Sequence, residues 1–387
     1  MFSKRLPAHA EVNALSRTVA ALRAAGTPIV DLTESNPTKA GFPYPLDLLT
    51  ALADGRALDY DPQPCGLRSA REAVAADYAR RGVAVDPAHV VLSASTSEAY
   101  SWMFKLLCNP DEGVLVPQPS YPLFEHLTRL EAVRTVPYLL EYHGRWEIDV
   151  ESLAAAPPDT RVLLLVSPNN PTGSYVSVRE VERLTAMCRD RQWAIVADEV
   201  FAEYTLDAQA PATELVRDAD VLSFTLGGAS KSLGLPQVKL AWMLAGGPPH
   251  MRDAALAALE LIADTFLSVS TPVQVAAPDL FRRAAEVRRG IHDRVTHNLG
   301  RAREVARRYR SCDLLRTEGG WSAVVRVPAT RGEEALVLDL VQREHVLVHP
   351  GFFFDFPHEA FVVVSLLPPE EVFAEAFDRV LRFASST

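Results

Sequence analysis

The chain has 387 residues, of which 48% are hydrophobic and 23% charged, and its formal net charge is -10. This length suits two domains, or one large domain with a smaller lobe, and the composition is that of a soluble globular protein. The acidic balance and the lack of a basic tract argue against nucleic-acid binding, and no apolar run approaches the roughly 20 residues of a membrane span.

The N-terminus and the cysteines bear on the cellular compartment. The first residues include charged side chains and lack the apolar core of a signal peptide. The four cysteines, Cys65, Cys108, Cys188 and Cys312, are widely spaced and form no CxxC pair. They predict reduced thiols in a cytoplasmic protein, and no metal site is expected.

Short apolar segments alternate with helical patterns in the middle of the chain. Five segments rich in aliphatic residues are predicted strands: 90–94, 114–117, 161–166, 193–198 and 221–226. Residues 177–192 have helical spacing, and Ser177 and Glu180 form a capping box there. Strands that are apolar on both faces and are separated by helices predict a parallel α/β sheet.

The sequence patterns at the two ends of the chain differ from the strand–helix alternation in the middle. A Pro-rich stretch before residue 46 predicts an extended arm, and an Arg-rich helical stretch over 282–310 leads into further strands and helices. We therefore expect an N-terminal arm that joins part of a small domain (1–45), a large domain (46–284) and a small α+β domain (285–387).

Polar residues gather just after the predicted strands. In an open parallel sheet, ligands bind beyond the carboxyl ends of the strands. The side chains at these positions are Ser95, Thr96, Ser97, Tyr121, Asn169, Asn170, Asp198 and Lys231. Each alone is more typical of a helix cap, a turn or packing. Together they offer an anion site, an aromatic ring, an amide, a carboxylate and an amine, a set that fits pyridoxal 5′-phosphate.

Lysine is rare in this chain, which makes its positions informative. Of the 39 basic residues, the lysines are Lys4, Lys39, Lys105, Lys231 and Lys239. Arginine keeps its proton in proteins, whereas lysine can lose it and become a nucleophilic amine. Lys231 is therefore the candidate for Schiff-base chemistry with the cofactor.

Three motifs carry a resemblance to a known family: SPNNPTG, ADEVF and SKSLGLPQVK. Asn170 precedes Asp198 by 28 residues, and Asp198 precedes Lys231 by 33. From about Leu32 to its C-terminus the chain resembles the class I/II aminotransferases, which are fold type I enzymes of the aspartate-aminotransferase-like superfamily. The resemblance implies a three-layer α/β fold, with a mostly parallel seven-stranded sheet in the large domain and a smaller α+β domain.

The resemblance also implies roles for these residues. Lys231 would form the Schiff base and move a proton, Asp198 would pair with the pyridine nitrogen, and Asn170 would contact the ring 3′-oxygen and the substrate. Tyr121 would stack on the ring. The phosphate would be held by Ser95, Thr96, Ser97, Ser230 and Lys239.

A further implied role concerns a second subunit. Tyr60 matches a tyrosine that reaches the phosphate of the neighbouring subunit's cofactor, which implies a homodimer with shared sites. The implied substrates are an amino acid and a 2-oxo acid.

Several positions depart from the family pattern. Lys239 stands where an arginine is usual, Gly228 where a serine is common, and Phe201 where a tyrosine usually contacts the 3′-oxygen. Without that tyrosine, the pKa of the Schiff base is expected to be higher. Val363 occupies the usual place of the arginine that binds the substrate carboxylate, so Asn36 and Lys39 on the arm become candidates for substrate binding.

The leading hypothesis is a PLP-dependent aminotransferase that works by a ping-pong mechanism. The alternative is a lyase, cyclase or decarboxylase of specialised metabolism on the same fold, which the missing arginine favours. A non-enzymatic sensor domain of a transcription regulator is disfavoured, because that class carries an additional DNA-binding segment. The run Phe352–Phe354 predicts core packing or an aromatic wall for an apolar substrate.

Overall fold

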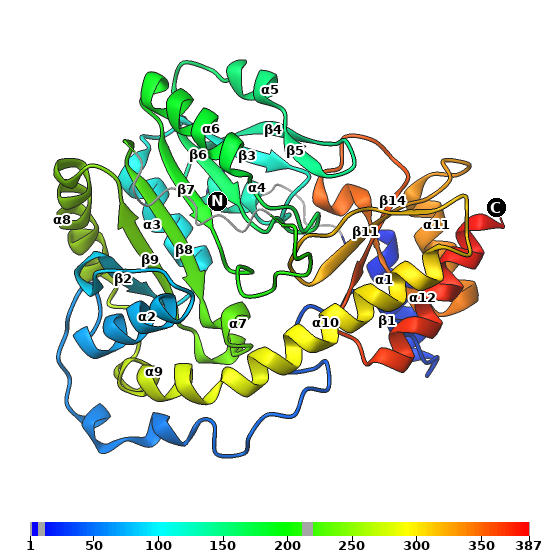
Figure 1. Cartoon of the computed structure of the whole chain (residues 1–387), viewed down its shortest axis with the longest axis horizontal. Helices are drawn as coiled ribbons and strands as arrows, with labels where there is room; N and C mark the ends of the chain where they lie inside the picture. Colours follow the sequence, from blue (N-terminus) through cyan, green and yellow to red (C-terminus); the bar gives the residue numbers. More distant parts are fainter. Residues whose placement is uncertain (1, 7–11, 211–219, 387) are drawn as a thin grey trace.

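An eight-stranded sheet forms the centre of the larger part of the molecule (Figure 1). The computed structural model describes residues 2–6, 12–210 and 220–386. The strand order is β2-β9-β8-β7-β6-β3-β4-β5. The strands are β2 (Val90–Ser93), β3 (Gly113–Gln118), β4 (Arg134–Tyr142), β5 (Trp146–Ile148), β6 (Thr160–Val166), β7 (Ala194–Asp198), β8 (Ser223–Gly228) and β9 (Ala241–Gly246).

The sheet is mostly parallel, as predicted. The run β4-β3-β6-β7-β8 is parallel throughout, whereas β9 is antiparallel to both β8 and β2. The predicted α/β class is confirmed. The sheet has eight strands rather than seven because the three-residue β5 extends it at one edge, antiparallel to β4.

Helices cover both faces of this sheet. The alternating side chains of β6 show why: Leu164 packs in one apolar cluster with Met103, and Leu163 packs in another with Leu184. A strand that is buried on both faces needs a helical layer on each side. One layer contains α3 (Thr96–Leu107), α4 (Phe124–Leu130) and α8 (Pro249–Phe266), and the other contains α5 (Val150–Ala154) and α6 (Val178–Arg191).

A second, smaller sheet lies at the other end of the molecule. It is antiparallel and has the order β10 (Asp313–Leu314), β11 (Ser322–Arg326), β14 (Phe361–Ser365) and β13 (His349–Pro350). The helix α12 (Glu370–Ser385) packs beside it against α10 (Ala285–Ala306). This part is the expected α+β lobe.

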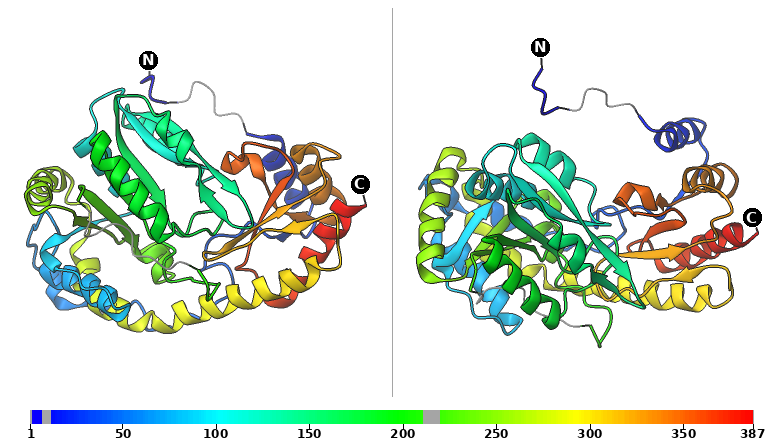
Figure 2. Two further views of the ribbon diagram at one scale, coloured as in Figure 1. Left: turned by 45° about the horizontal axis from the view of Figure 1, so that its top comes forward. Right: turned by 90° about the horizontal axis from the view of Figure 1, so that it is seen from above.

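One long helix and one short strand pair join the two parts. The helix α10, with 22 residues, spans about 33 Å and runs from the large sheet to the small one (Figure 2). At the N-terminal end, β1 (Val30–Asp31) pairs in parallel with β12 (Val346–Leu347), and α1 (Ala14–Ala24) packs on α11 (Glu333–Asp339). The helix α1 and the strand β1 are thereby attached to the small lobe.

The remaining helices complete the outer surface of the large part. The helices α2 (Arg68–Arg80) and α9 (Thr271–Arg283) pack against each other beside β2. Among the described residues, no single helix is both long and apolar enough to cross a membrane. The pair α8 and α9 meets that criterion by length and composition, with a bend of 119° between the two helices.

Candidate active site

A cavity of about 440 Å³ lies where the carboxyl ends of the central strands face the small lobe. Its size suits a small aromatic cofactor together with a substrate. The structure brings most of the predicted site residues to its wall: Ser95, Thr96, Ser97, Tyr121, Asn170, Asp198, Ser230, Lys231 and Lys239.

Asp198 is the last residue of β7 and is 7% exposed. Its Oδ1 accepts a 3.0 Å hydrogen bond from the backbone N–H of Val200, and its Oδ2 accepts a 2.5 Å bond from the hydroxyl of Tyr100. Burial raises the pKa of Asp198, while these hydrogen bonds and the charge of Lys231 act in the opposite direction. The carboxylate is thus fixed in orientation and lies beside the cavity, where a cation would stabilise its ionised form.

Tyr100 is a site residue that the sequence reasoning missed. Its ring is buried on α3 and also lines the cavity. Burial and the nearby Asp198 raise the pKa of Tyr100 well above its ordinary value, so it remains a hydrogen-bond donor. The available signal was its position four residues after Thr96, which places both side chains on the same face of the helix.

Lys231 lies on the short helix α7 (Ala229–Ser232), directly after β8. Its Nζ donates a 3.3 Å hydrogen bond to the carbonyl oxygen of Ser35 and lies 4.8 Å from the ring centroid of Trp321. Burial lowers the pKa of Lys231 to about 8, although the charges of Asp198 and Glu34 act to raise it. The amine is therefore closer to neutral at physiological pH than an exposed lysine.

The N-terminus of α3 forms one end of the cavity. Ser95 is the N-cap residue, and its side chain accepts a hydrogen bond from the N–H of Glu98. Thr96 and Ser97 follow in the first turn, where backbone N–H groups have no partner within the helix. Lys239 lines the same cavity in a left-handed conformation, with φ of 58°. These features suit an anion such as a phosphate.

Gly228, a departure from the family pattern, lies beside this end of the cavity. A Cβ at that position would be 3.4 Å from Ala241 and 3.5 Å from Thr96, which is ordinary contact distance. The neighbouring Gly227 is different, because a Cβ there would lie 2.4 Å from Trp242. Packing therefore requires glycine at position 227 but leaves room for a side chain at 228.

The two adjacent asparagines have different surroundings. Asn169 is 3% exposed, and its side chain accepts a bond from Ser120 and donates to Thr172 and to the carbonyl of Pro119. Asn170 is less buried and lines the cavity. Asn169 thus holds the loops together, and Asn170 lies at the cavity wall.

Aromatic rings surround the amine of Lys231. Its Nζ lies 5.5 Å from the ring of Phe201, and that ring meets Trp321 edge to face at 5.3 Å. Tyr121 is 39% exposed and packs edge to face against Phe124. From the small lobe, Phe353 and Phe354 line the cavity, and Phe354 also belongs to the apolar core.

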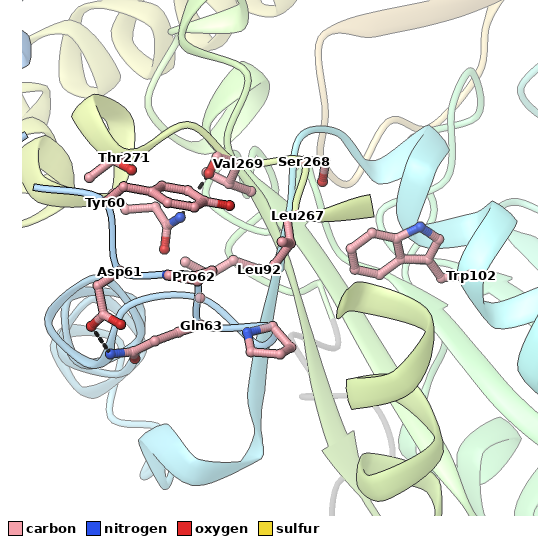
Figure 3. Close-up of a pocket in the computed structure, with 13 residues that line it drawn as sticks. Tyr60, Asp61, Pro62, Gln63, Leu92, Trp102, Leu267, Ser268, Val269 and Thr271 are labelled. Atoms are coloured by element: carbon pink, nitrogen blue, oxygen red, sulfur yellow. Dashed lines mark hydrogen bonds between the residues drawn. The ribbon is translucent and has the colours of Figure 1, made fainter. Parts of the chain in front are cut away.

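Three of the predicted site residues lie outside this cavity. Tyr60 is 71% exposed and borders a separate small pocket with Gln63, Val269 and Thr271 (Figure 3). Asn36 accepts hydrogen bonds from the backbone N–H and the hydroxyl of Thr38, and neither Asn36 nor Lys39 is at the cavity wall. On the same arm, Thr33 and Ser35 line the cavity instead, so substrate contact by Asn36 and Lys39 stays a prediction.

The small-lobe wall of the cavity is formed by residues with little charge. Val363 on β14 is 1% exposed and lines the cavity, as do His349 on β13 and Trp321. Sequence reasoning did not single out His349 or Trp321. A register prediction for the last strands would have placed His349 next to Val363, but the short length of β13 gives no clear strand pattern.

Comparisons with known proteins agree with this geometry. A family model described as "Aminotransferase class I and II" matches residues 27–380. The glutamate-pyruvate aminotransferase AlaA of Haemophilus influenzae is 26% identical over 378 residues, which cover 93% of this chain and 91% of that protein. The alanine aminotransferase of Mycobacterium tuberculosis is 26% identical over 388 residues, covering 95% and 88%.

A solved structure shows the same fold. An aminotransferase from Escherichia coli superposes with a TM-score of 0.86 at 24% identity, covering 100% of this chain and 98% of that one. At this identity, the likeness concerns the fold.

Proposed function

The chain belongs to the class I and II aminotransferase family and is an aminotransferase, and we propose that it holds pyridoxal 5′-phosphate between Lys231 and Asp198. The observation that carries the proposal is the meeting of this amine and this carboxylate in one cavity, at the ends of adjacent strands. Because the relatives named above are glutamate-pyruvate and alanine aminotransferases, we propose alanine or glutamate as the amino donor and a 2-oxo acid as the acceptor.

The residues at the cavity fit this cofactor. The N-terminus of α3 and the side chains of Thr96, Ser97, Ser230 and Lys239 would hold the phosphate, while Tyr121 and Asn170 would contact the ring. When bound, the cofactor supplies a carbonyl carbon for an amine and a cationic ring that accepts electron density.

Asp198 would stabilise a positive charge on the ring nitrogen. Its two oxygens are oriented by Tyr100 and by the N–H of Val200, so little reorganisation is needed when the cation arrives. At about 4 Å and an effective dielectric near 20, such a pair gains about 4 kcal/mol before desolvation. That interaction would favour the cationic form of the ring.

Lys231 would serve as nucleophile and as proton carrier. With a pKa of about 8, roughly a tenth of the amine is neutral at pH 7, a far larger share than for an exposed lysine. The aromatic rings of Phe201 and Trp321 lie on the same side of the cavity and limit the space around Nζ. The two half-reactions would use the same amine and the same cavity one after the other, so the kinetics would be ping-pong.

Reaction with amino acids tests the proposed function. The protein loaded with pyridoxal 5′-phosphate is mixed with L-alanine or L-glutamate, and its absorbance is followed. We expect conversion of the cofactor to its amine form, followed by return of the original spectrum on adding a 2-oxo acid. Release of carbon dioxide or of an elimination product without the amine form would support the lyase or decarboxylase alternative instead. Lys231→Ala is expected to abolish the conversion.

We also infer a homodimer with shared sites. Large apolar side chains on the segment before α2 are strongly exposed, including Leu46, Leu58 and Tyr60. Exposed apolar side chains of this size are candidates for a contact surface with a second copy. A second copy could bring Tyr60 toward a phosphate, because Tyr60 does not reach the cavity of its own chain. Light scattering that found only a monomer with full activity would contradict this inference.

Two further expectations remain proposals. A cytoplasmic location is supported by the free thiols of Cys65, Cys108, Cys188 and Cys312. The division into segments 1–45, 46–284 and 285–387 is supported by the start of α10 at Ala285 and by the pairing of β1 with β12. Limited proteolysis that cut first near residues 45 and 285 would support this division.

A further inference from the structure

His349 and Val363 lie next to each other on the small-lobe wall of the cavity. They are opposite residues in the antiparallel pair of β13 and β14. Opposite residues in such a pair share one face of the sheet, with Cβ atoms about 4.5–5.5 Å apart. Both side chains line the cavity. A side chain at position 349 therefore lies in the same region of the cavity as a side chain at position 363.

The imidazole of His349 contacts aromatic rings, and its nitrogens have no partner among the described residues. Its ring centroid lies 5.8 Å from that of Phe353 and 5.5 Å from that of Phe354. Within the part of the chain that the structure describes, no hydrogen bond or ion pair involves this ring. Its nitrogens are thus available to a ligand in the cavity.

Of the other polar groups at this wall, Ser365 is already engaged, whereas the buried indole N–H of Trp321 has no hydrogen-bond partner among the described residues and is a second neutral donor. The hydroxyl of Ser365 donates a 2.6 Å hydrogen bond to the carbonyl of Glu34. Two arginines of the small lobe are paired elsewhere, Arg326 with Asp313 and Arg331 with Asp339, and neither lines the cavity. Within the described ranges, the other cations at the cavity wall are Lys231 and Lys239, which the proposed function assigns to the cofactor.

We propose that His349 binds the carboxylate of the amino acid substrate, taking the place of an arginine on β14. The proposal rests on the proposed function, since an amino acid and a 2-oxo acid each bring a carboxylate into this cavity. A carboxylate buried against Val363 and the phenylalanines without a hydrogen-bond donor is strongly disfavoured. The imidazole supplies that donor and, when protonated, a compensating charge.

Protonation links this contact to pH. Burial lowers the pKa of His349, and the charge of Asp31 acts to raise it. Other charged groups on neighbouring elements include Glu333 on α11 and Asp355 after the turn Gly351–Phe354, and Asp198, Lys231 and Lys239 line the same cavity. A bound carboxylate favours the protonated ring, so binding takes up a proton. Affinity for the carboxylate is therefore expected to fall as pH rises through the pKa of His349 in the complex.

The test compares amino acids with their uncharged amides. The holoenzyme is mixed with L-alanine, L-glutamate or the α-amide of each, and the rate of cofactor conversion is measured against concentration at several pH values. Three variants are compared with the wild type. His349→Leu removes the hydrogen-bond donor, and His349→Gln keeps a neutral donor. His358→Leu is the control, because it replaces an exposed histidine outside the cavity by the same residue.

We expect the wild type to favour the amino acid over its amide. His349→Leu should raise the apparent Kd for the amino acid about tenfold or more, while the Kd for the amide and the maximum rate stay within about twofold. His349→Gln should lose less affinity and show a weaker pH dependence. His358→Leu should match the wild type, and thermal unfolding should show that all three variants are folded.

Two results would overturn the proposal while leaving the proposed function intact. One is an active His349→Leu variant that keeps the wild-type preference for the amino acid. The other is a wild-type enzyme that converts the amino acid and its amide equally well. If the wild-type holoenzyme reacts with neither amino acid donor, the proposed function fails first, and the role of His349 fails with it.

Discussion

The hydroxyl of Tyr100 donates a 2.5 Å hydrogen bond to Oδ2 of Asp198. Tyr100 is one turn along α3 from Thr96, and α3 begins at the anion end of the cavity. The same helix therefore positions the groups proposed to hold the phosphate and orients the carboxylate proposed to meet the ring nitrogen. A shift of α3 would move both ends of the cofactor site together.

Replacing Tyr100 by phenylalanine tests this arrangement. Tyr100→Phe removes a donor to a buried carboxylate, so the pKa of Asp198 should rise further and its ionised form should be less available. We expect affinity for pyridoxal 5′-phosphate to fall by about 10- to 100-fold, measured by titration of the apoprotein. Tyr138→Phe is the matched control, because that buried hydroxyl donates to the carbonyl of Leu164 away from the cavity. Equal losses in both variants would refute the role of Tyr100.

The low pKa of Lys231 predicts how fast the apoprotein captures the cofactor at different pH values. Capture needs the neutral amine, so below about pH 8 the rate should fall about tenfold for each pH unit and above it should level off. Rates measured by absorbance from pH 6 to 10 are compared with those of a blocked free lysine, which corrects for titration of the cofactor. A rate that climbs up to pH 10, as for the free lysine, would show that burial does not lower this pKa.

Substitutions at the two adjacent asparagines should have different effects, one on the stability of the fold and the other on the reaction with substrate. Asn169→Ala removes bonds to Ser120, Thr172 and the carbonyl of Pro119, so the free energy of unfolding should fall by about 1–3 kcal/mol. Asn170→Ala should change it by less than about 0.5 kcal/mol and should slow the reaction with amino acids. Denaturant unfolding and single-turnover rates measure the two effects. The opposite pattern would mean that the roles of these residues are exchanged.

Arg288 is predicted to be a main electrostatic contact between α10 and the large part of the molecule. It is 8% exposed, and its guanidinium lies 3.1 Å from Asp77 and 3.2 Å from Glu203. Arg288→Met leaves two buried carboxylates with fewer partners and should cost about 3–5 kcal/mol in the free energy of unfolding.

An exposed ion pair on the same helix provides the control for Arg288. Arg301 contacts Glu304 at 2.7 Å, and both side chains are about half exposed. Arg301→Met should therefore cost less than about 1 kcal/mol. If denaturant unfolding gave the same midpoint for both variants, the network around Arg288 would be no stronger than a surface ion pair.

Much of the large domain could be predicted from local sequence patterns. Strands such as β6 and β7 are continuous apolar runs because both faces are buried, and Asp198 stands at the end of such a run. By contrast, the sequence patterns do not identify β4, the edge strand β5 or the antiparallel β9. The strand β4 is only partly buried, and β9 contains Trp242, Met243 and alanines that suit a helix equally well.

The contacts across the cavity could not be read from the sequence. Tyr100 meets Asp198 from 98 residues away, and the Nζ of Lys231 meets the carbonyl of Ser35 from 196 residues away. These pairs depend on how α3, the arm and the small lobe close around the sheet, and no local pattern encodes that closure. The sequence reveals a valine at position 363 in place of an arginine. It does not reveal that His349 faces Val363, because that follows only from the register of β13 and β14.

The central claim is that Lys231 binds the cofactor, and labelling of the amine tests it most directly. The protein is loaded with pyridoxal 5′-phosphate, reduced with borohydride to make the link permanent, digested and analysed by mass spectrometry. Lysines occur at positions 4, 39, 105, 231 and 239, so the site can be assigned without ambiguity. We predict a stoichiometric label on Lys231 that is absent from Lys231→Ala. A label on Lys239 or another lysine instead, or no label at all, would contradict the account.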